Sequence, residues 1–300
     1  MPRESSPEMP PNLESKEAEK EHPSLTVFLM RHGESEEDKS KPNRGLTEKG
    51  QQEVRENFND IINQIITDEL PNFKDFDDTE KRKTAAQETL AKVEMHLADS
   101  RTDRTMEQAW LERKILVELG LPPEELYLSK ATYEWAQKKG ELQAVPETAG
   151  PGIKKRLAGV QGLDKAPEFR KQLDSPEYQH RVGAQDTLIA WALTPEDQVP
   201  GGVEKRSQME QRLHRDLAKV EHVAQSKKLA GRPKRPIYIA NSHASIITLA
   251  TASELNVPIE KLGEVPNAEG LRFDFYGEDK SHTSKPFGKN LEAKVAELKQ

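Results

Sequence analysis

The chain has 300 residues, of which 34% are hydrophobic and 32% are charged, with a formal net charge of −7. This balance suits one soluble globular domain with a core of roughly 200 residues and polar chain around it. The absence of cysteine from the sequence excludes disulfides, thiolate metal sites and cysteine nucleophiles. No apolar run approaches the ~18 residues of a membrane span, so we expect a cytoplasmic protein without membrane contact. The negative charge gives no support to nucleic-acid binding.

The N-terminal segment, residues 1–23, is rich in proline, serine, glutamate and lysine. Such a composition buries too little apolar surface to stay ordered, so we expect a disordered tail. A strand is predicted next, because residues 27–30 form an apolar run between this tail and Gly33. Arg31 and His32 follow the strand directly, where open α/β sheets bind their ligands.

A long helix is predicted after this turn, with Thr47 as its N-cap and apolar residues at helical spacing as far as Leu70. The charged residues 71–91 predict an inserted loop and a helical segment.

A second strand and a second helix follow. Residues 93–97 alternate between apolar and polar, as a strand does, and residues 102–120 show a helical pattern ended by glycine. Arg104 falls in the first turn of this helix, where backbone N–H groups and the helix dipole favour an anion.

Residues 121–200 contain many prolines and only short helical patches, over residues 133–139 and 185–193. We interpret them as a long insertion that forms a cap over the site. The stretch Pro200-Gly201-Gly202-Val203-Glu204 then opens another helix with apolar residues at helical spacing.

A third strand-to-helix turn lies in the last third of the chain. Residues 237–240 predict a strand and residues 244–255 an apolar helix, with His243 in the turn between them. Residues 271–276 predict a last strand, and residues 281–300 a charged tail that includes a short terminal helix.

Each of the three turns presents a cationic or imidazole side chain: Arg31 with His32, Arg104, and His243. Parallel strands bring such turns to one edge of the sheet. Guanidinium groups match phosphate oxygens with forked donors, and helix N-termini add backbone donors. An imidazole with a pKa near ~6.5 is substantially neutral at neutral pH and can form a covalent intermediate. The pattern predicts a phosphoryl-transfer site for a phosphorylated small molecule, without a metal ion or other cofactor.

Four motifs, in this order, resemble the histidine phosphatase superfamily, the phosphoglycerate-mutase-like proteins. They are Arg31-His32-Gly33-Glu34-Ser35, Leu46-Thr47-Glu48-Lys49-Gly50-Gln51, residues 100–109 and Ser242-His243-Ala244-Ser245. In the third motif Thr105, Glu107 and Gln108 depart from the family's pattern. The resemblance covers about residues 24–120 and 200–276.

The resemblance implies a three-layer α/β sandwich with a mainly parallel central sheet and an inserted cap region. The domain would span residues 24–280, with insertions at about 71–91 and 121–200. By the same resemblance, His32 would be the phosphorylated nucleophile, and Arg31, Arg104 and His243 would hold the phosphoryl group.

The resemblance also bears on the proton donor. Ala244 follows the second histidine, where the acid-phosphatase branch has an aspartate, so we expect a glutamate from the middle region, as in the mutase-like branch. Glu134 is the first candidate and Glu147 the second. Neither stands in a complete version of the family's Leu-x-Glu-x-x-x-Gly pattern.

Residues 159–166 are similar to a stretch of the cofactor-dependent phosphoglycerate mutases. Because Lys154 stands where those enzymes have their acid glutamate, and Asp38 where they have an asparagine, we interpret this as chance or a remnant. We therefore predict a phosphoric monoester hydrolase that acts through a phosphohistidine. The alternatives are a mutase-type phosphotransferase and a catalytically impaired module that binds a phosphorylated ligand. The sequence indicates neither the substrate nor the oligomeric state.

Overall fold

The computed structural model describes residues 22–36, 44–75, 79–147, 149, 158–226, 233–276 and 282–300. Nearly all of the predicted N-terminal tail lies outside the described residues, as do Asp38 and Lys154.

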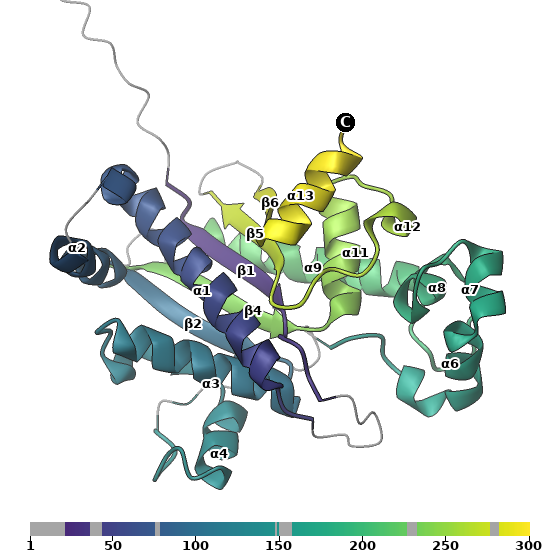
Figure 1. The fold of residues 1–300 in the computed structure, drawn as a ribbon, viewed down its shortest axis with the longest axis horizontal. Coiled ribbons are helices and arrows are strands. Elements are labelled where there is room, and N and C mark those ends of the chain that lie inside the picture. Colours follow the sequence, from purple (N-terminus) through teal and green to yellow (C-terminus); the bar gives the residue numbers. More distant parts are fainter. Residues whose placement is uncertain are drawn as a thin grey trace, which may run out of the picture.

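Within these ranges, six strands form one sheet in the order β3-β2-β4-β1-β5-β6 (Figure 1). The strands are β1 Leu25–Arg31, β2 Val93–Asp99, β3 Leu126–Leu128, β4 Arg235–Ser242, β5 Gly270–Phe275 and β6 Thr283–Phe287. The first four strands run parallel, whereas β5 is antiparallel to both β1 and β6. The predicted mainly parallel central sheet is confirmed.

Helices lie on both faces of the sheet (Figure 1). One face carries α1 Glu48–Glu69, α2 Thr79–Leu90, α3 Asp103–Glu118 and α4 Lys130–Lys138. The other carries α9 Arg206–Ala224 and α11 Ala244–Glu254, while α12 Ile259–Leu262 packs against α11, and α13 Lys289–Leu298 packs against α12 and β6. Three short helices stand to one side, α6 Pro167–Asp174, α7 Pro176–Val182 and α8 Thr187–Leu193. This is the predicted three-layer α/β architecture.

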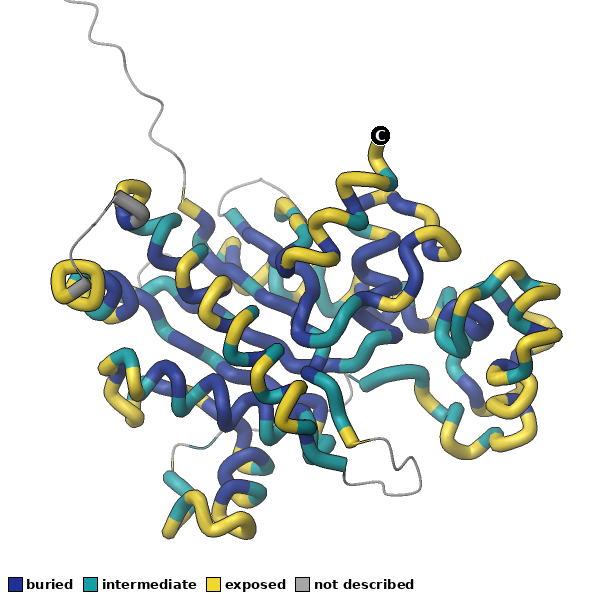
Figure 2. Tube along the Cα trace, in the orientation of Figure 1, coloured by how far each residue is buried: buried dark blue, intermediate teal, exposed yellow. Residues whose placement is uncertain are grey.

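Alternation along β1 builds a core on each face of the sheet. Leu25 and Leu29 join the cluster under α9 and α11, while Phe28 and Met30 join the cluster under α1 and α3. All four side chains are buried, each worth roughly 1.5–3 kcal/mol on transfer from water. Figure 2 shows the result as buried strands beneath helices whose outer faces are exposed.

The first long helix begins as predicted. Thr47 is the N-cap of α1, and its hydroxyl accepts a hydrogen bond from the backbone N–H of Gly50 at 3.0 Å. Capping fixes where the helix starts, and so it also fixes the loop that returns from β1.

Two segments differ from the sequence-based expectation. β3 and α4 come from the region interpreted as a cap, yet β3 joins the sheet beside β2 and α4 packs on α3. Residues 283–287, expected within a charged tail, form β6, whereas α13 corresponds to the short terminal helix expected there. Phe287 is buried at the end of β6, and the polar and charged residues before it obscure the strand in the sequence.

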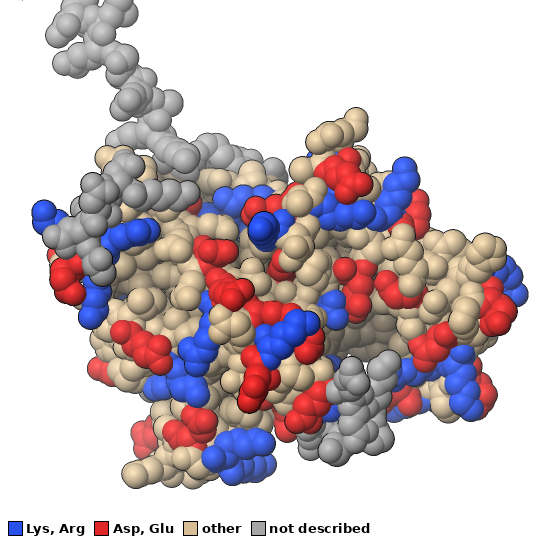
Figure 3. All heavy atoms as spheres, viewed as in Figure 1, with Lys and Arg blue, Asp and Glu red and all other residues tan. Residues whose placement is uncertain are grey.

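No helix among the described residues is long and apolar enough to cross a membrane. On the face seen in Figure 3, acidic and basic side chains are intermixed rather than gathered into one field.

Candidate active site

The strand register brings two of the predicted turns together. β1 pairs in parallel with β4, so that Arg31 lies opposite Ser242. The next residues, His32 and His243, therefore leave the sheet side by side, and the backbone N–H of His32 donates to the carbonyl of Ser242 at 3.1 Å. Ser100 leaves the end of β2 at the same edge.

Arg104, in the first turn of α3, links the two imidazoles. Its Nε donates to His32 Nε2 at 2.9 Å, and its Nη2 lies 3.2 Å from His243 Nδ1. The two rings lie edge to face with centroids 5.6 Å apart. We call these three residues the His32–Arg104–His243 cluster.

The hydrogen bonds assign a tautomer to each ring. A guanidinium only donates, so His32 Nε2 and His243 Nδ1 both accept from Arg104. The other nitrogen of each ring then carries the proton: His32 Nδ1 donates to the carbonyl of Gly33 at 2.7 Å, and His243 Nε2 donates to Ser100 Oγ at 3.0 Å. The nitrogen of His32 that holds the lone pair faces the guanidinium.

Burial and positive charge keep both imidazoles neutral. Burial, followed by the charge of Arg104, holds the pKa of His32 well below its usual value. The same two causes lower the pKa of His243 to about 3, with further contributions from Arg31 and Arg44. Burial, with Arg44 and Arg31 nearby, lowers the pKa of Arg104 to about 10, which still leaves it charged at neutral pH. The site therefore combines neutral imidazoles with several cations.

Arg31 is held at the rim of this site by the loop before β5. Its Nη1 donates to the carbonyl of Val265, and its Nη2 pairs with the carboxylate of Glu264 at 3.1 Å. Its Nε is buried and has no partner among the described residues.

The two candidate proton donors are exposed side chains outside the cluster. Glu134 is on α4, where its side chain is 48% exposed and pairs with Lys130 at 3.6 Å. Glu147 is exposed in the segment after α4. In the part of the chain that the structure describes, no hydrogen bond or ion pair joins either glutamate to the His32–Arg104–His243 cluster.

Sequence reasoning missed Arg44, which lies in the loop before α1. Its positive charge helps to lower the pKa of both Arg104 and His243. Its Nη1 donates to the carbonyl of Glu36 at 3.2 Å. The loop between the first two motifs looked merely polar, and nothing in its spacing marked this arginine.

A buried polar network under the loop that holds His32 and Gly33 was also missed. The backbone N–H of Gly33 donates to Gln108 Oε1 at 3.0 Å, and Gln108 Nε2 donates to Asn241 Oδ1 at 2.7 Å and Glu112 Oε1 at 3.1 Å. Asn241 Nδ2 donates to Glu112 Oε2 at 2.8 Å. Burial raises the pKa of Glu112 to about 8. Two features of the sequence could have indicated this network. Asn241 is an amide in an apolar strand, and Gln108 precedes Glu112 by four residues, which places both on the same side of α3.

The stretch similar to phosphoglycerate mutases lies at the site. A methyl group added to Gly159 would sit 3.6 Å from His243 Cβ and 3.0 Å from Ser245 Oγ. Gly159 therefore lies directly against His243.

Among the described residues, no three or more histidine, aspartate or glutamate side chains gather in a way that could ligate a metal ion. The groups that meet at the site are imidazoles, guanidinium groups and backbone donors.

No protein-family model matches the chain, and no curated protein sequence matches it significantly. Among solved structures it is similar to phosphoglycerate mutase from Bacillus anthracis, with 17% identity and a TM-score of 0.45 over 92% of this chain and 97% of that one. It is also similar to YhfR of Bacillus stearothermophilus, with 13% identity and a TM-score of 0.46 over 89% and 100%. A mycobacterial glucosyl-3-phosphoglycerate phosphatase aligns at 12% identity and a TM-score of 0.40 over 87% and 96%.

The chain resembles the histidine phosphatase superfamily. We rest this resemblance on the four sequence motifs and on the geometry in which the fold assembles them. The first, third and fourth motifs supply His32, Arg104 and His243, and the second supplies the capped start of α1.

The lowered pKa values of this histidine phosphatase-like site lead to a direct prediction. Titration followed by 15N NMR is expected to show both site imidazoles neutral at pH 6, because burial and the arginines disfavour their protonated forms. His282 is an internal control, since its hydrogen bond to Glu254 raises its pKa above the usual 6.5. The order of protonation on acidification is thus His282 first and His243 much later. Protonation of His243 at or above pH 6.5 would contradict this electrostatic account.

Proposed function

We propose that this chain is a metal-independent phosphatase of the histidine phosphatase type, which hydrolyses a phosphorylated small molecule through a phosphohistidine at His32. The observation that carries the proposal is the Arg104 guanidinium, which hydrogen-bonds to both imidazoles at the carboxyl edge of the sheet. A forked cation between two neutral imidazoles suits a phosphate dianion better than it suits any neutral substrate.

In the first step, the substrate phosphate draws the guanidinium of Arg104 away from His32 Nε2. The freed lone pair attacks phosphorus and forms the P–N bond, while the ester P–O bond breaks and its electron pair leaves with the alcohol oxygen, which takes up a proton. Arg104 and Arg31 balance the charge on the equatorial oxygens of the phosphoryl group, and His243, which accepts from Arg104, holds that guanidinium in place.

In the second step, a water oxygen attacks the phosphorus of phosphohistidine and gives a proton back to the group that protonated the alcohol. The P–N bond breaks, its electrons return to His32 Nε2, and inorganic phosphate is released. Throughout both steps the hydrogen bond from His32 Nδ1 to the carbonyl of Gly33 holds the ring in place and stabilises the positive charge on the phosphorylated imidazole.

For the proton on the leaving oxygen we propose Glu134 as donor, with Glu147 as the alternative. An alkoxide leaves poorly without a proton, whereas the phenolate of an activated aryl phosphate leaves unaided. Glu134→Gln is therefore expected to slow hydrolysis of an alkyl phosphate by ~10²–10⁴-fold while leaving aryl phosphate hydrolysis nearly unchanged.

The matched comparison is Glu147→Gln, assayed on the same two substrates. Selective loss in Glu147→Gln alone moves the assignment to Glu147. Equal rates in wild type and both variants would remove both glutamates from the mechanism.

One observation favours a second function, binding of a phosphorylated ligand without turnover. Both candidate donors are exposed, and Glu134 pairs with Lys130 rather than with a site residue. The cluster of arginines and neutral imidazoles would still bind an anion if no acid served it.

Hydrolysis of p-nitrophenyl phosphate in the presence of a chelator, with titration calorimetry of inorganic phosphate alongside, distinguishes the two functions. A phosphatase turns the ester over and binds phosphate. A binding module binds phosphate and leaves the ester intact. Failure of both measurements contradicts the proposed site.

A further inference from the structure

Residues 158–161 form a strap against the second histidine. At Gly159 an added methyl group would stand 3.8 Å from His243 Cδ2, at ordinary van der Waals distance from the imidazole. The strap comes from the middle region of the chain and belongs to no strand, whereas His243 follows β4. Contacts outside the sheet therefore hold the strap beside His243.

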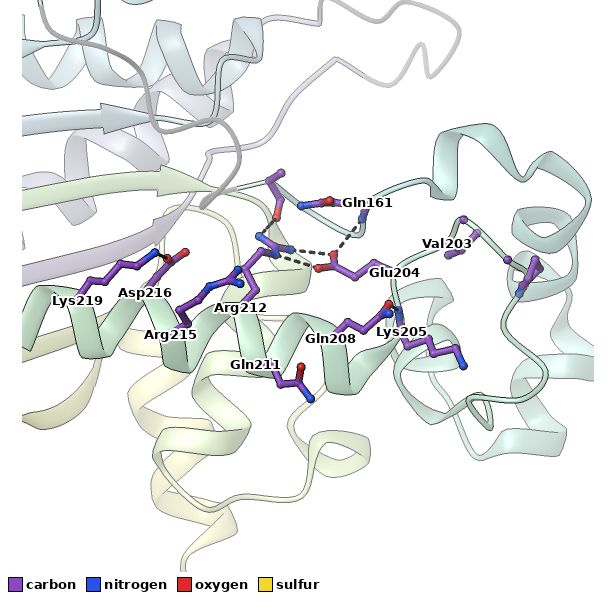
Figure 4. A pocket seen from close by; sticks show the side chains of 14 residues that line it. Gln161, Val203, Glu204, Lys205, Gln208, Gln211, Arg212, Arg215, Asp216 and Lys219 are labelled. Atoms are coloured by element: carbon purple, nitrogen blue, oxygen red, sulfur yellow. Dashed lines mark hydrogen bonds and ion pairs between the residues drawn. The ribbon is translucent and has the colours of Figure 1, made fainter.

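A buried ion pair holds the strap in this position. Arg212, on α9, donates to both carboxylate oxygens of Glu204 at 2.9 Å. The same guanidinium donates to the strap carbonyls of Ala158 at 3.1 Å and Gly159 at 3.3 Å. The side chains of Arg212 and Glu204 are only 7% and 9% exposed. One planar guanidinium thus joins the carboxylate to the strap backbone (Figure 4).

Glu204 holds the strap from the other side. Its carboxylate accepts from the backbone N–H of Gln161 at 3.1 Å, and its own N–H donates to the carbonyl of Gln161 at 2.8 Å. Its carbonyl accepts from the indole N–H of Trp191, on α8, at 2.9 Å. The strap, α9 and the short helices at the side of the domain therefore meet at one residue.

The backbone just after the strap packs closely against the backbone just before Glu204. Gly162 has φ +76°, and a methyl group there would lie 2.0 Å from the carbonyl oxygen of Gly202. Only glycine meets both demands, so the strap ends in close backbone contact with residues 200–204.

A buried ion pair contributes little net stability, because desolvation of the two charges offsets their attraction. Its geometry is specific, however, because two carboxylate oxygens and two backbone carbonyls accept hydrogen bonds from the one guanidinium of Arg212. The pair borders an open hollow of 1270 Å³ along α9, which Ala158 and Gln161 of the strap also line (Figure 4).

We propose that Arg212 and Glu204 are positioning residues, which hold the strap against His243 and so keep water from one side of its imidazole. The inference rests on the proposed function only in giving this shielding a use: without competing water, His243 keeps accepting from Arg104 and so holds that guanidinium where the phosphoryl group would bind. The other groups that face His243 are Arg104, Arg31, Arg44 and the ring of His32.

Arg212→Lys tests whether Arg212 keeps the strap against His243. Lysine keeps the charge but cannot serve four acceptors in one plane, so the strap carbonyls lose their donor and water reaches His243. The titration of His243, followed by 15N NMR on the full-length protein, is expected to move upward by about one pKa unit, a tenfold change in proton affinity. Arg206→Lys is the matched control, because Arg206 pairs with Glu210 on the same helix at 2.8 Å with both side chains partly exposed. It is expected to leave the titration of His243 unchanged.

Gly159→Ala provides a second test that leaves the ion pair intact. Its methyl group would touch Ser245 and His243, so the NMR resonance of His243 Cδ2 is expected to shift. Gly201→Ala is the control, because a methyl group at Gly201 meets nothing within 4 Å.

The outcomes separate clearly. An upward shift in Arg212→Lys together with a moved resonance in Gly159→Ala, and neither in the controls, supports the proposal. A folded Arg212→Lys with an unchanged His243 titration overturns it. If Arg212→Lys does not fold, an unmoved Cδ2 resonance in Gly159→Ala overturns the proposal and a moved one supports it. None of these measurements requires turnover, so a wild type that hydrolyses no phosphate ester would contradict the proposed function and leave this test intact.

Discussion

His32→Ala is expected to abolish hydrolysis of both aryl and alkyl phosphates, with a loss on the order of 10⁴-fold or more in kcat, the scale on which enzymes lose rate when a covalent nucleophile is removed. The physical reason is that the lone pair on His32 Nε2 faces the guanidinium that would hold the phosphate. The measurement is a steady-state assay of p-nitrophenyl phosphate and an alkyl phosphate, with chelator present.

His214→Ala is the control for the first prediction, since His214 is an exposed histidine on α9. It is expected to keep wild-type rates. Calorimetry on His32→Ala adds a check on the fold, because the variant retains Arg31, Arg104 and His243 and should still bind inorganic phosphate. Wild-type turnover by His32→Ala would exclude His32 as nucleophile.

Arg104→Ala is expected to lower kcat/KM by roughly 10³–10⁵-fold, the range found when an arginine that stabilises a transferring phosphoryl group is removed. Among the described residues, Arg104 is the side chain that hydrogen-bonds to both His32 and His243. Its loss removes a forked donor and leaves both imidazole lone pairs without their partner. The assay is kcat/KM on the aryl phosphate.

Arg104→Lys separates charge from geometry. Lysine supplies a positive charge but not the fork, so we expect it to recover only part of the lost activity. Arg170→Ala, at an exposed position on α6, controls for a general loss of positive charge. Equal activity of Arg104→Ala and Arg170→Ala would contradict the assigned role.

The parts of the fold that could be predicted from the sequence are those with strong local periodicity. The apolar run before Arg31-His32, the Thr47 cap and the helix that carries Arg104 all correspond to observed elements. The approach of His32 and His243 followed from one general rule, that parallel strands present their carboxyl ends at one edge. That prediction did not depend on the local pattern of residues.

The remaining features depend on contacts between distant segments. Glu112 looks like a surface glutamate on a helix, and only the packing of α3 on β4 makes it a buried partner of Asn241. The strap and its hold by Arg212 join residues separated by about fifty positions, and no local period marks such a contact. β6 was obscured because its one fully buried side chain, Phe287, follows polar and charged residues.

The most direct test of the central claim is a search for the phosphoenzyme. Wild-type protein is mixed with a 32P-labelled phosphomonoester, quenched within milliseconds in base, and digested for mass spectrometry. The account predicts label on His32, stable to base and labile to acid, and no label in His32→Ala. Label on a serine, or turnover without any labelled protein at saturating substrate, would contradict it.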